Sequence, residues 1–223
     1  MHQRKSKKIL IYFFLFILVG TLNQKNFEKN KVITKNEIKI TGLEGKNYYQ
    51  LKESLNYLKT DNLLFLNKPK LIEIINSNSL VHNFSVFIKY PSTIDIKIFK
   101  AKFLATIKKN EQYFLLGSNG KFTKTYETQS NLPIIFGDFE VKEFFELKKI
   151  LDDNNFEYKQ IKRLLSYKTG RWDIETHSGL IIKLPKDRLE NSVRLALKVL
   201  EINKTNKIKL IDLRQNNQVI IND

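Results

Sequence analysis

Apolar residues first concentrate in one uncharged run, Ile9 to Leu22, which directly follows a short stretch with four basic residues. Strongly apolar residues favour transfer into a bilayer by roughly −0.3 to −0.6 kcal/mol each. The run is shorter than the ~20 residues of a standard span, but lysine side chains at its ends can reach outward. The pattern therefore predicts a single transmembrane helix over residues 9–24, with residues 1–8 in the cytoplasm and residues 25–34 as a linker.

A cleaved signal peptide is the alternative interpretation of this run, because an apolar segment of about 7–15 residues fits a signal sequence equally well. The run ends in Gly20-Thr21-Leu22-Asn23-Gln24, which has no cleavage site of the Ala-x-Ala type. We therefore expect an uncleaved anchor whose remaining chain lies outside the cytoplasm.

The next part of the chain, residues 35–103, predicts the order strand, helix, helix, strand, strand. Residues 37–41 alternate between apolar and polar types, and two longer alternating runs, 84–90 and 94–99, form a hairpin. Two helical patterns lie between the first strand and this hairpin, and their predicted caps are Asn47 and Asn67. A three-stranded sheet covered on one side by two helices is the expected packing.

The rest of the chain, residues 104–223, predicts a mostly antiparallel β domain with two helices, so the fold class is α+β. Helical periodicity occurs twice, over 141–151 and 189–200. Patterns typical of strands occur over 104–108, 112–116, 156–165, 171–175, 180–184, 208–213 and 218–221.

Composition and charge argue against several functions. The net charge is +16, but the lysines are scattered, so a solvated surface is favoured over a nucleic-acid site. Cysteine is absent, which excludes disulfides and thiol chemistry. The three histidines, His2, His82 and His177, show no metal-ligand spacing, and no nucleophile motif occurs. We therefore expect no enzyme activity, no metal and no cofactor.

Several short segments resemble one family in chain order. They are Thr41-Gly42, Tyr90-Pro91-Ser92-Thr93-Ile94, Leu132 to Gly137, Trp172 to Leu184, and Ile211-Asp212-Leu213-Arg214. Together these segments resemble the FtsQ/DivIB bacterial cell-division proteins. The resemblance implies a short cytoplasmic tail, one inner-membrane span, a POTRA domain at residues 35–103 and a β domain at residues 104–223. It also implies a non-enzymatic role at the division septum.

The end of the chain, Gln218 to Asn222, has little charge and no proline, so a strand there would be an unguarded sheet edge. From the residues alone, pairing within its own sheet is equally favoured. The resemblance implies that this region binds FtsB, which comes with FtsL, by strand addition. The implied contact residues are Arg214, Gln215, Asn217, Val219 and Ile220, and Gln215 stands where the family usually has an aromatic residue. Arg171 is added as a candidate contact from the residues themselves, because it precedes a strand expected near this surface and can pair with an acidic partner.

A second function keeps the POTRA domain but changes its role. The protein would then be a periplasmic scaffold or chaperone of envelope assembly that binds extended client strands. This alternative predicts many unfolded clients and no concentration at the septum.

Overall fold

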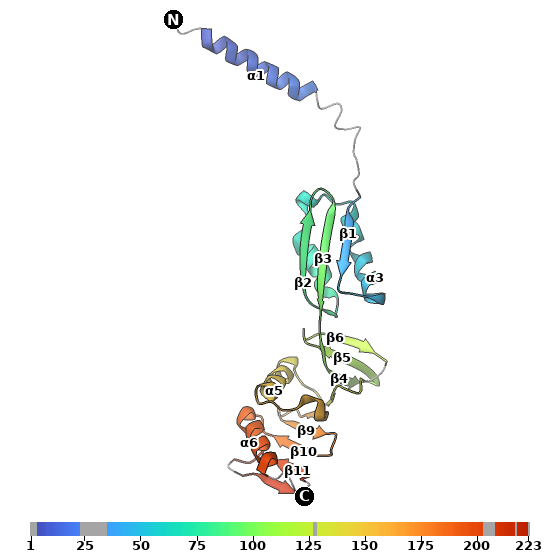
Figure 1. The fold of residues 1–223 in the computed structure, drawn as a ribbon, viewed down its shortest axis with the longest axis vertical. Helices are drawn as coiled ribbons and strands as arrows, with labels where there is room; N and C mark the ends of the chain where they lie inside the picture. Colours follow the sequence, from blue (N-terminus) through green and yellow to red (C-terminus); the bar gives the residue numbers. More distant parts are fainter. Residues whose placement is uncertain (1–3, 23–34, 127–128, 203–207, 217, 223) are drawn as a thin grey trace.

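The computed structural model describes residues 4–22, 35–126, 129–202, 208–216 and 218–222. The predicted linker at 25–34 lies outside these residues. After an N-terminal helix, α1 (Arg4–Leu22), the strands form two separate sheets, one of three strands and one of nine. The α+β class expected from the sequence is confirmed (Figure 1).

The predicted transmembrane helix is wrong. Within the described residues, no helix is both long enough and apolar enough to cross a membrane. The physical reason lies in the composition of α1, because its first turns hold Arg4, Lys5, Lys7 and Lys8. The apolar part that remains, Ile9 to Val19, spans about 16 Å of helix, against the ~30 Å of a bilayer core.

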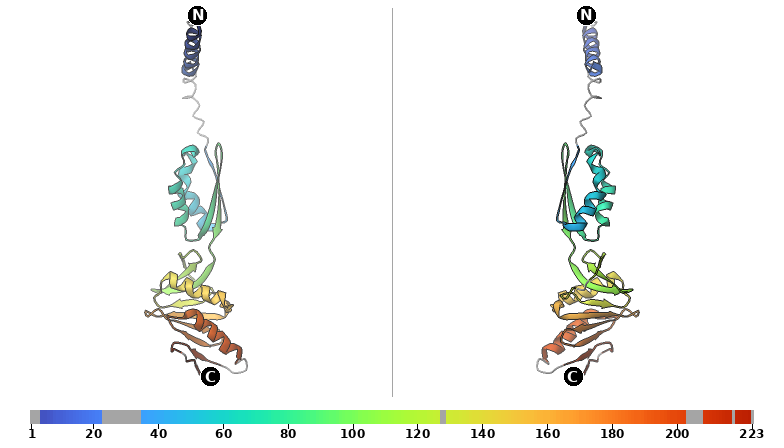
Figure 2. Two further views of the ribbon diagram at one scale, coloured as in Figure 1. Left: turned by 90° about the vertical axis from the view of Figure 1, so that its left-hand side faces the viewer. Right: turned by 90° about the vertical axis from the view of Figure 1, so that its right-hand side faces the viewer.

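The three-stranded unit has its helices on one side and its sheet on the other (Figure 2). Its strand order is β1-β3-β2, in which β3 pairs parallel with β1 and antiparallel with β2. Its core contains fully buried Leu55, Leu58, Ile75, Ile94 and Ile96. The elements are β1 (Glu37–Thr41), α3 (Gly45–Ser54), η1 (Asn56–Lys59), η2 (Leu63–Phe65), α4 (Lys68–Ser77), β2 (Val81–Lys89) and β3 (Thr93–Lys100).

One of the two predicted helix caps in this unit is confirmed. The Asn67 side chain accepts a hydrogen bond of 3.1 Å from the backbone N–H of Lys70 at the start of α4. The cap predicted at Asn47 is wrong, because α3 begins earlier, at Gly45, after an extended Glu44. Gly45 itself has a positive φ of 57°, so the turn before the helix sets its start.

The nine-stranded sheet has the order β12-β11-β10-β9-β8-β7-β4-β5-β6. Three of its pairings are parallel, β4 with β7, β7 with β8 and β10 with β11, and the others are antiparallel. Its strands are β4 (Phe103–Lys109), β5 (Gln112–Gly117), β6 (Phe122–Thr125), β7 (Ile134–Phe136), β8 (Ile161–Ser166), β9 (Trp172–Thr176), β10 (Ile181–Leu184), β11 (Leu210–Asp212) and β12 (Ile220–Asn222).

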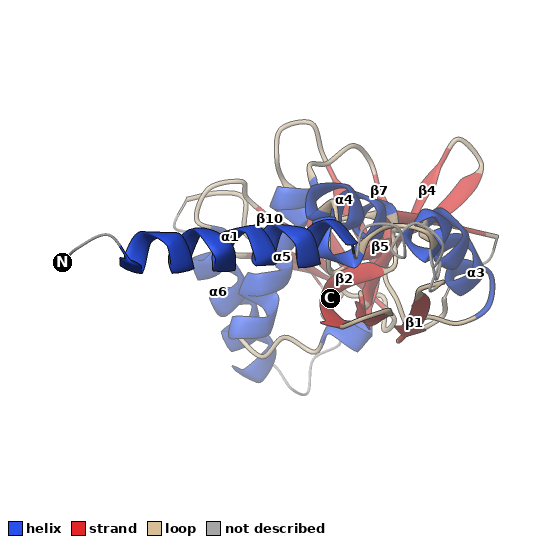
Figure 3. Cartoon of the chain, turned by 90° about the horizontal axis from the view of Figure 1, so that it is seen from above, coloured by secondary structure: helices blue, strands red, loops and turns tan. Residues whose placement is uncertain are grey.

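Figure 3 shows the two helices that belong to this unit, α5 (Val141–Asp153) and α6 (Leu189–Ile202), in blue. Their apolar stripes are buried in the same core as these strands. Trp172 and Phe144 are the largest fully buried side chains in this core. The strand predicted over 156–165 begins only at Ile161, because residues 158–160 form the short 3-10 helix η3. Phe156 is nevertheless buried in the core.

The turn between β5 and β6 joins the two units. The side-chain amide of Asn119 donates hydrogen bonds of 2.9 and 2.8 Å to the carbonyl oxygens of Ser79 and Val81. The Thr123 hydroxyl donates to the Ser79 hydroxyl at 2.8 Å. The Lys121 ammonium group also donates to the carbonyl oxygen of Asn76. These contacts hold the start of β6 against the end of α4 and the start of β2.

Replacing Gly42 with alanine should lower the free energy of unfolding by about 2 kcal/mol or more. Gly42 has φ of +92°, and an added Cβ would lie 2.0 Å from the carbonyl oxygen of Ile98. The matched control is Gly45→Ala, where φ is +57° and no atom lies within 4 Å of the added Cβ. Gly45→Ala should lower the free energy of unfolding by about 1 kcal/mol. Urea unfolding of both full-length variants measures this difference, and equal losses would contradict the expectation.

Candidate functional site

The last strand, β12, forms one edge of the nine-stranded sheet. It pairs antiparallel with β11, through Asp212 opposite Ile220 and Ile211 opposite Ile221. The side chains of Ile220 and Ile221 are 45% and 42% exposed, although both are large and apolar. Edge strands in soluble proteins usually carry charges or proline that prevent further pairing, and Gln218 to Asn222 has neither. This edge is therefore open to an additional strand.

A row of charged side chains crosses the face of the sheet that points away from α5 and α6. Trp172 and Ile174 of β9 are buried in the helix-covered core, so Asp173 between them lies on the opposite face. Lys183 of β10 is in register with Asp173 on one side and with Asp212 of β11 on the other. The row therefore reads Asp173, Lys183, Asp212 and leads to Ile220 at the edge.

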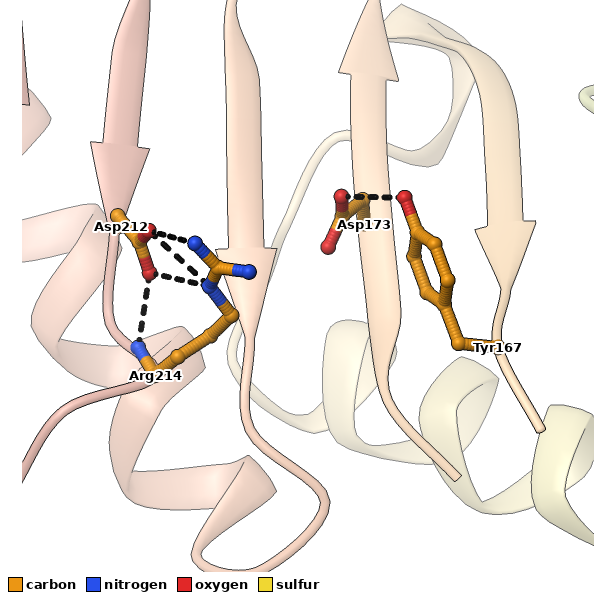
Figure 4. Close-up of polar contacts among 4 residues, drawn as sticks. All are labelled: Tyr167, Asp173, Asp212 and Arg214. Atoms are coloured by element: carbon orange, nitrogen blue, oxygen red, sulfur yellow. Dashed lines mark hydrogen bonds and ion pairs between the residues drawn. The ribbon is translucent and has the colours of Figure 1, made fainter. Parts of the chain in front are cut away.

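Arg214 holds the end of this row in place, just after β11 (Figure 4). Its Nε donates to both carboxylate oxygens of Asp212, at 2.8 and 3.0 Å, and its backbone N–H donates to Oδ1 at 3.1 Å. These charge-assisted hydrogen bonds lower the pKa of Asp212. The Arg214 side chain remains partly exposed, so its guanidinium group is also accessible from solvent.

A second polar contact on this face joins Asp173 of β9 to Tyr167, which lies in the loop before β9 (Figure 4). The Tyr167 hydroxyl donates to Oδ2 of Asp173 at 2.9 Å. Burial of Asp173 raises its pKa, an effect that the Tyr167 hydrogen bond and the nearby charges of Lys183, Arg214 and Arg171 oppose in part. The Arg171 guanidinium lies 5.3 Å from the centre of the Tyr167 ring.

The structure places the described contact residues in four settings. Arg171 and Arg214 flank the charged row, and Ile220 lies on the open edge. Val219 is partly buried against the core, so part of its side chain serves the fold. Gln215 lines a cleft of about 110 Å³ between α6 and the turn after β11, together with Arg188, Asn191, Ser192, Leu195, Leu213 and Gln218. Asn217 lies outside the described residues.

Sequence reasoning missed three residues of this face, namely Tyr167, Asp173 and Lys183. The alternation Trp172-Asp173-Ile174 contained a signal, because a polar residue between two buried ones must face the other side of the sheet. The register that puts Lys183 between two aspartates is not visible in the sequence. No cluster of three or more His, Asp or Glu side chains suited to a metal ion occurs in the part of the chain that the structure describes.

Comparison with known proteins identifies the family. Residues 105–214 match the family described as "Cell division protein FtsQ/DivIB, C-terminal". The chain is 27% identical over 191 residues to "Cell division protein FtsQ" of Rickettsia prowazekii (strain Madrid E), covering 82% of this chain and 69% of that protein. Residues 105–214 are therefore identified as a C-terminal domain of the FtsQ/DivIB type. The resemblance seen in the sequence is thereby confirmed.

Further comparisons show how far the likeness extends. The FtsQ protein of Rickettsia bellii (strain RML369-C) is 28% identical over 176 residues, covering 75% of this chain and 64% of that protein. The chain thus spans about two thirds of the length of these relatives. Among solved structures, the major extracytoplasmic domain of DivIB from Geobacillus stearothermophilus aligns with 48% of this chain and 98% of its own, at 13% identity and a TM-score of 0.34.

The part that matches the FtsQ/DivIB family includes most of the charged face but stops before the open edge. Arg171 and Arg214 lie within the matched residues 105–214, and Arg214 is the last of them. Gln215, Val219 and Ile220 lie beyond its end. The assignment to this family of cell-division proteins therefore rests on the body of the nine-stranded unit, and the role of β12 has to be argued from its geometry.

Replacing Asp212 and, separately, Asp173 with asparagine should change the pH dependence of stability in opposite directions. Arg214 lowers the pKa of Asp212, so the stabilisation is complete above the ordinary aspartate pKa of about 4 and is lost as the pH falls through the lowered pKa. Asp212→Asn should therefore be less stable than the wild type by about 1 kcal/mol at neutral pH. This difference should disappear in acid.

Asp173→Asn should show the reverse. Burial raises the pKa of Asp173. Ionised Asp173 therefore destabilises the fold at pH values above this raised pKa. The destabilisation is absent below the ordinary aspartate pKa, where the side chain is protonated in both the folded and the unfolded chain. The neutral asparagine should therefore gain stability relative to the wild type at neutral pH, and the gain should vanish on acidification. Urea unfolding over a pH series measures both variants, and a shift of the same sign in the two would contradict the assignment.

Proposed function

We propose that this protein acts in bacterial cell division as a non-enzymatic binding protein of the FtsQ type. In this proposal the nine-stranded unit receives FtsB- and FtsL-like partners by strand addition at β12. The three-stranded unit serves as a POTRA domain that helps to place the protein at the septum. The complex would link early division proteins to septal peptidoglycan synthesis.

The observation that carries this proposal is the uncharged and exposed edge strand β12. A partner segment that pairs with β12 would satisfy main-chain groups along the edge, which gives affinity with little demand on sequence. Ile221 is in register with buried Ile211, so the added strand would extend the core on the side of α6. Ile220 lies on the opposite face, next to the charged row. Both apolar side chains would thus be covered by one added strand.

The charges near this edge supply specificity. Arg214 and Arg171 are both partly exposed beside the row, and Arg214 is oriented by Asp212. Acidic residues on a partner would be attracted to these arginines, which raises the association rate and fixes the register of the added strand. Because Gln215 lines a small cleft beside α6, it would contact partner side chains on the helix side of the edge.

Replacing Ile220 with aspartate should weaken copurification of the FtsB-like partner by about tenfold or more, because it places an unpaired charge at the centre of the buried contact. The matched control is Ile72→Asp on α4, since Ile72 is 46% exposed and Ile220 is 45% exposed. Both substitutions lie on the surface and should leave the unfolding midpoint nearly unchanged. Val219→Asp is a poorer test, because the partly buried side chain would also destabilise the fold.

The same variants are then expressed as fluorescent fusions in cells depleted of the native protein. Wild type and Ile72→Asp should appear at midcell and restore division, whereas cells with Ile220→Asp should grow as filaments. Normal division with Ile220→Asp, together with undiminished recovery of the partner, would contradict strand addition at β12. A uniform distribution of the wild-type fusion in normally dividing cells would contradict the division role itself.

A further inference from the structure

The opposite edge of the nine-stranded sheet is formed by β6, and its surroundings differ from those of β12. β6 is the last strand in the sheet order and pairs with β5. Since the Gly117 N–H donates to the Lys121 carbonyl oxygen, alternate residues from Lys121 onward direct their main-chain groups toward β5. Phe122 and Lys124 are the residues in between, so their main-chain N–H and C=O groups point toward the free side of β6. These groups form a template for one further strand.

An apolar groove of about 470 Å³ lies next to this edge. Its apolar lining comes from Ile107 of β4, Phe114 of β5, Phe122 of β6 and Phe139 of the segment before α5. Phe122 is 48% exposed, so a large part of its ring is open to solvent. The groove lies on the face of the sheet that carries the core, because Phe114 is in register with Ile107, a core residue.

Two segments that border the groove are held by contacts with the rest of the fold. The Phe139 ring packs against Trp172 at 5.8 Å and against Phe144 at 6.2 Å between ring centroids, so this wall is continuous with the core. On the other side, Thr123 and the turn before β6 are hydrogen-bonded to the three-stranded unit through Ser79. A preformed site costs less conformational entropy when it binds, and this favours a ligand over an incidental surface depression.

The charges around the groove select the class of partner. Lys108 and Lys109 line it, and Lys124 is in register with Phe114 on the groove face. Lys108 is paired with Glu111 at 3.1 Å, whereas neither Lys109 nor Lys124 forms an ion pair with any of the described residues. Asp138 is the acidic residue of the lining. The lysines disfavour pairing between two copies of β6 and attract carboxylates.

We propose that β6 and this groove form a second binding site, which takes an extended acidic segment of another protein. The segment adds as a strand to β6, its alternate apolar side chains enter the groove between Phe114, Phe122 and Phe139, and its carboxylates meet Lys109 and Lys124. Apolar side chains and main-chain pairing supply the affinity, and the lysines supply the preference for acidic sequences. The site is separate from β12 and does not depend on the function proposed for it.

The test uses the full-length protein and a fluorescently labelled synthetic peptide in which glutamate alternates with phenylalanine or valine. Fluorescence anisotropy should show salt-dependent binding of this peptide and much weaker binding of a peptide with lysine in place of glutamate. Phe122→Asp should lower the affinity by about tenfold. The matched control is Phe87→Asp, because Phe87 is also an exposed strand residue, 58% accessible, on the other sheet. It should leave binding unchanged.

Further substitutions test the preference for acidic peptides and the location of the binding site separately. Lys124→Glu alters only an exposed charge, so it should weaken binding of the acidic peptide without unfolding the chain, and Lys149→Glu on α5 is its control. Ile220→Asp should bind the peptide as well as the wild type does. Loss of binding with Ile220→Asp alone would move the peptide to β12 and overturn the proposal. Equal binding of acidic and basic peptides, or a dimer that Phe122→Asp dissociates, would overturn it as well.

Discussion

Burial of Trp172 and Phe144 between one face of the nine-stranded sheet and two helices is the interaction on which both edges depend. α5 and α6 cover the middle of that face, where the strands contribute Ile174, Leu184 and Ile211 to the same core. β12 and β6 are the outermost strands of this sheet. Because the covered part is continuous and tightly packed, β12 and β6 are held in fixed positions while their outer sides remain available for pairing.

The same alternation that builds the core also produces the charged face. Burying Trp172 and Ile174 forces Asp173 to the other side of β9, and the registers of β10 and β11 then align Lys183 and Asp212 with it. Partly exposed ion pairs contribute little to stability, so the row matters more for orientation than for folding. It holds Arg214 beside the open edge in a defined geometry.

The two edges differ in a way that suits different partners. β12 is short and exposed along its length, and its neighbours are a charged row and a small cleft. β6 is anchored through Asn119 and Thr123 to the three-stranded unit, and a larger apolar groove adjoins it. Main-chain pairing provides affinity at either edge, but the side chains around each edge decide which sequences it accepts. If both proposals hold, one sheet would bind two unrelated segments without competition.

Local pattern determined much of this protein. Alternation located the hairpin of β2 and β3, helical spacing located α5 and α6, and short motifs identified the family, because each signal lies within a few neighbouring residues. Only the tertiary structure decided the rest. β7, three residues long, is too short to show a period, yet it lies inside the sheet, between β4 and β8. The apolar run near the N-terminus predicted a span that α1 does not provide, because its basic first turns leave too little apolar length. Which strands are neighbours, and therefore which edges remain open and which charges meet, depends on pairing between residues far apart in the chain, and a local period carries no record of that pairing.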